Sequence, residues 1–138
     1  MAALAIRVEL SDKGENRMLV GAATIFTVRD LAASLAHYRD ALGFTVTFQY
    51  GEPAFYACLC RDEVSLHLRA STRWTSGNGA IAVFVKDVDA LHDELIARGA
   101  KVLKPPQNYA YGMRDFDVAD LDGNQLTFGM GTQSASEK

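Results

Sequence analysis

The sequence predicts an α+β fold in which two tandem βαβββ modules form one domain. Three observations predict it. The chain has 138 residues, of which 49% are hydrophobic and 22% charged, and this suits one globular domain with its own core. The same order of segments occurs twice along the chain, as in an internal duplication. Matching landmarks in the two halves lie 56 to 60 positions apart: Asp30 with Asp87, Gly43 with Gly99, Asp62 with Asp122, and Leu66 with Leu126.

Each half begins with a short β-branched and aromatic run, which is typical of a buried strand. These runs are residues 23–28 and 80–85. Asp30 and Asp87 follow where a helix N-cap is expected, because a carboxylate accepts hydrogen bonds from free backbone N–H groups. Apolar residues then recur at helical spacing, and Gly43 and Gly99 come where a helix end favours a left-handed residue. Each half is therefore expected to contain a strand followed by a helix.

After each glycine, apolar and polar residues alternate as they do in a strand with one buried face. The alternating segments are residues 44–48, 64–68, 116–118 and 126–128. Residues 61–63 and 120–124 are expected to be the turns before the last strands, since Gly123 and Asn124 tolerate positive φ. Each half therefore reads as a strand, a helix and about three further strands.

These segments set the expected boundaries. We expect one domain over residues 19–130, with modules at about 20–70 and 79–130 joined by the polar segment 71–79. Residues 131–138 are small and polar, and we expect a flexible tail there. Residues 1–18 are either a leader or an added edge strand, since residues 5–10 alternate in polarity.

Composition excludes several classes of function. The net charge is −3, so the chain lacks the basic character of a general nucleic-acid binder. No run approaches the roughly 18 apolar residues that a membrane span needs, and Arg7 and Glu9 interrupt the start of the chain as they would not in a signal peptide. Cys58 and Cys60 form a lone C-x-C pair, which is neither a disulfide framework nor a zinc site. We expect a cytoplasmic protein with reduced thiols, whose role the sequence leaves open.

Several segments together resemble the vicinal oxygen chelate superfamily, also called the glyoxalase/bleomycin resistance protein/dioxygenase superfamily, and its bleomycin-resistance branch. They are residues 28–44, 56–62, 66–68, 111–116 and 120–124. The resemblance covers about residues 20–130. It implies a cup lined by both modules, and a homodimer in which two cups are completed across the interface.

The resemblance also implies where a metal would bind. In this superfamily each module gives two ligands, one from its first strand and one from its last. These four positions fall on Ala23, His67, Ala80 and Thr127. Alanine has no donor atom and a threonine hydroxyl is a poor ligand, so we expect no metal and no other cofactor. The other two histidines, His37 and His92, fall within the expected helices and cannot complete such a site. Because the superfamily's catalysis usually depends on the metal, the sequence favours binding over catalysis.

Alternation places His67 and Arg69 on the face away from the core, and Phe84 on the matching face of the second module. Aromatic rings in the cup would stack on a flat ligand, and acidic groups would favour a cation. The candidate ligand-binding residues are His67, Arg69, Trp74, Phe84, Tyr109, Tyr111, Arg114 and Asp117. They predict a protein that holds a small aromatic or cationic molecule, as bleomycin resistance proteins hold an antibiotic.

Two alternatives stay open at this point. One is an enzyme of the lyase, isomerase or dioxygenase kind, with a rebuilt site around His67, Arg69 and Asp117. The chain carries neither the G-x-S-x-G turn of many hydrolases nor a glycine-rich phosphate loop, so the sequence gives no basis for those two kinds of enzyme. The other is a structural dimer whose cup is vestigial.

Overall fold

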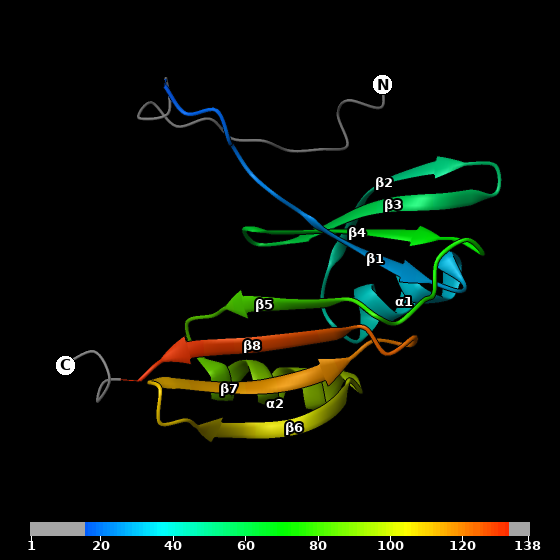
Figure 1. Cartoon of the computed structure of the whole chain (residues 1–138). Helices are drawn as coiled ribbons and strands as arrows, with labels where there is room; N and C mark the ends of the chain where they lie inside the picture. Colours follow the sequence, from blue (N-terminus) through cyan, green and yellow to red (C-terminus); the bar gives the residue numbers. More distant parts are fainter. Residues whose placement is uncertain (1–15, 133–138) are drawn as a thin grey trace.

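The structure is a computed structural model that describes residues 16–132. It confirms the two βαβββ modules (Figure 1). The first consists of β1 (Thr24–Val28), α1 (Leu31–Asp40), β2 (Thr45–Gly51), β3 (Ala54–Arg61) and β4 (Val64–Ala70). The second consists of β5 (Ala80–Phe84), α2 (Val88–Arg98), β6 (Lys101–Asn108), β7 (Met113–Ala119) and β8 (Gln125–Gly131). The expected edge strand at residues 5–10 and residues 133–138 of the expected tail lie outside the described residues.

Each module forms its own four-stranded sheet with the same topology. The strand order is β1-β4-β3-β2 in the first sheet and β5-β8-β7-β6 in the second. The first and last strands of each module pair in parallel, and the remaining pairs are antiparallel. The last strand of each module therefore lies inside its sheet, next to the first strand.

Three of the four expected caps are confirmed; the Gly43 cap is wrong, because the C-cap of α1 is Ala41 in the right-handed conformation and Gly43, with φ of 77°, comes two residues later. Asp30 accepts a hydrogen bond from the backbone N–H of Ala33 at 3.1 Å, and Asp87 accepts one from Ala90 at 3.0 Å. Gly99 closes α2 in the left-handed conformation, with φ of 93°. Each carboxylate satisfies a backbone donor that the first turn of its helix leaves unpaired.

One face of each sheet packs against a helix and forms the core, because alternate residues of a strand point to opposite faces. The fully buried core side chains of the strands include Phe26, Val28, Leu66 and Leu68 in the first module and Phe116, Val118 and Leu126 in the second. The opposite face of each sheet carries no helix, and we call these two surfaces the first and second open faces.

The modules contact each other through a buried polar cluster. The Tyr38 hydroxyl on α1 donates to the Asp120 carboxylate at 2.8 Å, and both side chains are buried. Asp120 also accepts hydrogen bonds from the backbone N–H groups of Asp122 and Asn124 and from the Asn124 side chain. The Asn124 amide in turn donates to the carbonyl of Thr27 in the first module, at 3.1 Å. These bonds join α1 and β1 to the turn that precedes β8.

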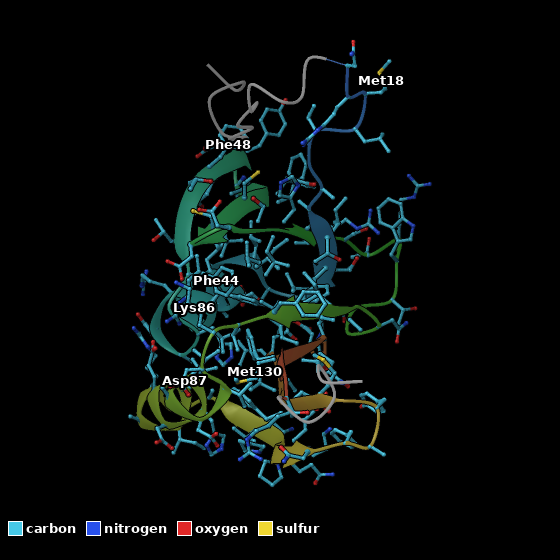
Figure 2. All side chains as sticks on the ribbon, turned by 90° about the vertical axis from the view of Figure 1, so that its left-hand side faces the viewer. Met18, Phe44, Phe48, Lys86, Asp87 and Met130 are labelled. Atoms are coloured by element: carbon cyan, nitrogen blue, oxygen red, sulfur yellow. The ribbon has the colours of Figure 1, made fainter. Side chains whose placement is uncertain are left out.

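The segment before β1 runs away from both sheets (Figures 1 and 2). Met18 and Leu19 are 87% and 88% exposed. Within residues 16–132, neither helix has the length and apolarity to cross a membrane.

Candidate functional site: two open sheet faces

The first open face centres on His67 of β4. Its register neighbours are Ile25 on β1 and Cys58 on β3. Leu66 and Leu68, on either side of His67, are fully buried in the core. The expected orientation of His67 away from the core is therefore confirmed.

His67 forms a pair with Tyr56 of β3. The Tyr56 hydroxyl lies 2.8 Å from Nδ1 of His67, and both residues are half-buried. Burial raises the pKa of the Tyr56 phenol and lowers the pKa of His67, because it penalises the charged form of each group. The lowered pKa favours the neutral imidazole, so the Tyr56 hydroxyl and Nδ1 of His67 share a hydrogen bond between two neutral groups, and Nε2 lies outside that bond.

Arg69 and Trp74 lie at the end of β4 and in the loop that follows it. The Arg69 guanidinium carbon lies 3.9 Å from the centre of the Trp74 ring, and that of Arg73 lies 4.8 Å from it. Nε of Arg69 donates to the Thr27 hydroxyl at 2.9 Å. Trp74 is 45% exposed. Two cations thus share one indole at the edge of the first open face.

The second open face carries a charged cluster. The Lys104 ammonium lies 3.0 Å from Asp115 and 3.7 Å from Asp117, and it donates to the Tyr109 hydroxyl. The bond to Tyr109 and the two carboxylates raise the pKa of Lys104 despite some desolvation. This lysine is therefore a fixed cation rather than a base or nucleophile. The cluster holds two carboxylates and one ammonium, so it carries an excess negative charge.

Exposed aromatic rings lie on and beside this face. The Tyr109 and Tyr111 rings stack with centres 5.2 Å apart and planes 8° apart. Phe84 of β5 is 79% exposed and Tyr111 69% exposed. Such large exposed rings mark a contact surface more often than an isolated exposed leucine does.

Arg114 lies elsewhere. It forms a two-point contact with Asp89 of α2, at 2.7 and 3.0 Å, and also donates to Asn108. Its neighbour Asp115 lies on the second open face, so alternation directs Arg114 to the helix side of the sheet. The structure thus separates Arg114 from the other sequence-predicted site residues.

A shallow hollow of about 540 Å³ lies where the modules meet. It is lined by Thr24 at the start of β1 and by Ala22 and Ala23 before it, by Val64 and Ser65 at the start of β4 and Glu63 before it, and by residues 81–84 of β5. Small side chains at Ala23 and Ala82 keep it open, and Phe84 lies at its border. The hollow therefore touches both modules.

The four positions where relatives would hold a metal do not suit one. Ala23 and Ala80 have no donor atoms, and the Thr127 hydroxyl is occupied in donating to Asp117 at 2.8 Å. Nδ1 of His67 is engaged in its hydrogen bond with the Tyr56 hydroxyl. No group of three or more His, Cys, Asp or Glu side chains within residues 16–132 is arranged to hold a metal ion. A divalent ion would find one imidazole nitrogen where it needs three or four ligands.

Cys58 is not an activated thiol. Cys58 is buried, and burial raises the pKa of its thiol. A thiolate nucleophile needs the opposite shift. Cys58 and Cys60 are both free thiols.

Three residues of the site are not in the sequence-predicted ligand-binding set. Tyr56 stands out in the sequence only as one of several aromatic residues around the turn at residues 51–53, and Arg73 only as part of a polar loop. Lys104 precedes two prolines, and nothing in that segment signals a strand. Pairing of β6 with β7 places Lys104 opposite Asp117, and only that pairing makes its role apparent.

The comparisons with known proteins agree with this architecture. The family model of the Glyoxalase/Bleomycin resistance protein/Dioxygenase superfamily matches residues 21–128. The chain therefore belongs to this superfamily. No curated protein sequence matches it.

Solved structures share the fold across most of the chain. A bleomycin-binding protein from bleomycin-producing Streptomyces verticillus, complexed with copper(II)-bleomycin, is 27% identical with a TM-score of 0.70, covering 83% of this chain and 98% of that one. TioX from Micromonospora sp. ML1 is 20% identical with a TM-score of 0.68, covering 80% and 99%. TnmS3, an antibiotic-binding protein from Streptomyces sp. CB03234, is 21% identical with a TM-score of 0.66, covering 84% and 100%.

Proposed function

We propose that this protein binds a small aromatic molecule without chemical turnover and needs no metal to do so. The observation that carries the proposal is the donor set at the four superfamily positions, Ala23, His67, Ala80 and Thr127. This donor set supports no metal-centred reaction, and exposed rings and fixed charges lie on or beside the two open faces. A concave surface with apolar walls and a few placed polar groups is the usual form of a binding site.

The bleomycin-binding structural neighbour supports a drug-like ligand. At 27% identity over most of both chains, it makes an antibiotic the first ligand class to test. In the second module, the acidic excess of Asp115 and Asp117 over Lys104 would attract a cationic part of such a ligand.

We further propose that a second copy of this chain completes the site. Each open face covers one side of a ligand, and the hollow between the modules is shallow. The faces also carry opposite charges: Arg69 lies on the first, and Asp115 and Asp117 lie on the second. A first face laid against a partner's second face would pair these charges and bury Phe84.

Two measurements test the proposed function. Copper-free bleomycin is titrated into the protein and followed by calorimetry and by the emission of Trp74, the single tryptophan. Saturable binding in the micromolar range is expected, and Tyr111→Ala should weaken it about fivefold, because a stacked ring contributes about 1 kcal/mol. Ile96→Ala on α2, also exposed, is the matched control and should bind normally. Absence of binding would contradict the bleomycin assignment, and native mass spectrometry of the purified protein would then search for a co-purified ligand.

The dimer is tested separately by light scattering during size-exclusion chromatography. The protein is expected to elute at twice its 15.0 kDa mass. Phe84→Asp should shift it toward the monomer, whereas Ile96→Asp should not. A monomer at all concentrations would contradict the dimer.

A further inference from the structure

Arg69, Arg73 and Trp74 form a cationic cluster whose counter-ion is not among the described residues. Five other arginines within residues 16–132 each contact a carboxylate: Arg29, Arg39, Arg61, Arg98 and Arg114. Neither Arg69 nor Arg73 forms such a pair within residues 16–132. Both guanidiniums instead lie over one indole, within 4.8 Å of its centre.

This arrangement concentrates positive charge at one place. Two guanidiniums on one ring repel each other, and a cation–π contact at a half-exposed ring contributes only about 1 kcal/mol. An oxyanion between or beside them would relieve the repulsion and accept hydrogen bonds from both guanidinium groups. The cluster thus has the chemistry of an anion site.

The cluster is also held in position. The bond from Nε of Arg69 to Thr27 fixes the orientation of the guanidinium plane. The backbone N–H of Arg73 donates to the Ser71 hydroxyl at 2.9 Å, which shapes the loop that carries Trp74. A site whose side chains are already oriented loses less conformational entropy on binding.

Its place on the first open face indicates what kind of ligand it serves. Arg69 and His67 lie on the same face of β4, two residues apart, so the imidazole adds a second polar group beside the Arg69 guanidinium. Arg69 contacts Thr27 of β1, and Ile25 lies two residues before Thr27 on the same strand. The Ile25 side chain is 45% exposed. Donors for an acid therefore adjoin apolar surface.

We propose that the Arg69–Arg73–Trp74 cluster binds an oxyanion carried by the ligand, so that the aromatic ligand bears a carboxylate, sulfonate or phosphate group in addition to any cationic part that Asp115 and Asp117 attract. This rests on the proposed small-molecule function. It differs from a purely cationic ligand, which the sequence left as one expectation.

The test uses three naphthalene probes that differ only in charge: 2-naphthalenesulfonate, 2-naphthalenemethanol and 2-naphthylmethylammonium, each titrated by calorimetry. We expect the sulfonate to bind about tenfold more tightly than the neutral probe, as one added charged hydrogen bond predicts. Arg73→Gln and Arg69→Gln should each remove that preference and leave the neutral probe unaffected. Arg39→Gln, which also removes one exposed positive charge, should retain it.

A second arm titrates sodium sulfate against sodium chloride at equal ionic strength and follows Trp74 emission. A saturable response to sulfate that Arg73→Gln abolishes supports the anion site even if no naphthalene probe binds. Equal binding of all three probes, unchanged by either arginine substitution, overturns the anion site and leaves the proposed function standing. No response in either arm also overturns the anion site, and the bleomycin titration then decides the proposed function separately.

Discussion

Removing the Tyr38 hydroxyl is the sharpest test of how the two modules are joined. Tyr38 is fully buried, and its hydroxyl donates to the Asp120 carboxylate at 2.8 Å. Burial and the neighbouring carboxylate both raise the pKa of this phenol, so it stays a donor at every accessible pH. Tyr38→Phe therefore removes one hydrogen bond to a buried charged acceptor and keeps the ring.

The expected loss is about 2 kcal/mol in the free energy of unfolding. A hydrogen bond to a charged group contributes about 1.5–3 kcal/mol. The lower part of that range applies, because the same Asp120 oxygen still accepts from the Asn124 amide at 2.9 Å. Asp120→Ala removes the shared acceptor of four hydrogen bonds. It should therefore cost more, about 4 kcal/mol.

Urea unfolding measures these losses at several protein concentrations, so that dissociation of any dimer is separated from unfolding. Tyr50→Phe is the matched control, because Tyr50 is 58% exposed, and it should change stability by less than about 0.5 kcal/mol. A Tyr38→Phe protein as stable as the control would refute the assignment of this bond as a link between modules.

Three further predictions concern a glycine turn, the titration of His67 and the metal content of the protein. Gly77→Ala should cost about 2 kcal/mol or more in thermal unfolding, because φ is +85° and an added Cβ would lie 2.1 Å from the Asp122 carbonyl oxygen. Gly21→Ala, with no atom within 4 Å of its Cβ, should be neutral, and equal effects would contradict the reasoning. His67 should titrate below its usual pKa in an NMR pH series, because burial lowers it; its unfolded form binds the proton more readily, so stability should fall as pH drops below about 6.5. His67→Gln should reduce that pH dependence, and an NMR pKa above the usual value would contradict the burial argument. Elemental analysis of protein purified without chelator should find zinc, nickel, iron and manganese well below one equivalent, and a stoichiometric ion would overturn the metal-free proposal.

Sequence patterns predicted the parts of the fold that local chemistry determines. Asp30 and Asp87 cap their helices as expected, and the alternating segments became β2, β4, β7 and β8. Strand β6 was not located beforehand, because Pro105 and Pro106 interrupt its pattern. The structure accommodates them because β6 is an edge strand, where a missing N–H costs no ladder bond on the outer side.

The site was less predictable, since it depends on pairing between distant strands. Alternation correctly placed His67 on the face away from the core. Arg114 was grouped with Asp117, although Arg114 is directly next to Asp115 on β7 and therefore points to the opposite face of the sheet. The Lys104 cluster requires the register between β6 and β7, which includes two irregularities. The Arg69–Trp74 contact depends on how the loop after β4 folds back over that strand. None of these can be read from spacing alone.

The position of the contacts between modules has an evolutionary consequence. Tyr38, Asp120 and Asn124 are buried among α1 and the turn before β8, whereas the residues of the binding proposals lie on the open faces or at their edges. Exposed positions such as Phe84 and Tyr111 can therefore change with little effect on folding. Different residues thus determine ligand preference and the stability of the scaffold. A designer could therefore randomise the open faces of this chain while leaving the contacts between its modules intact.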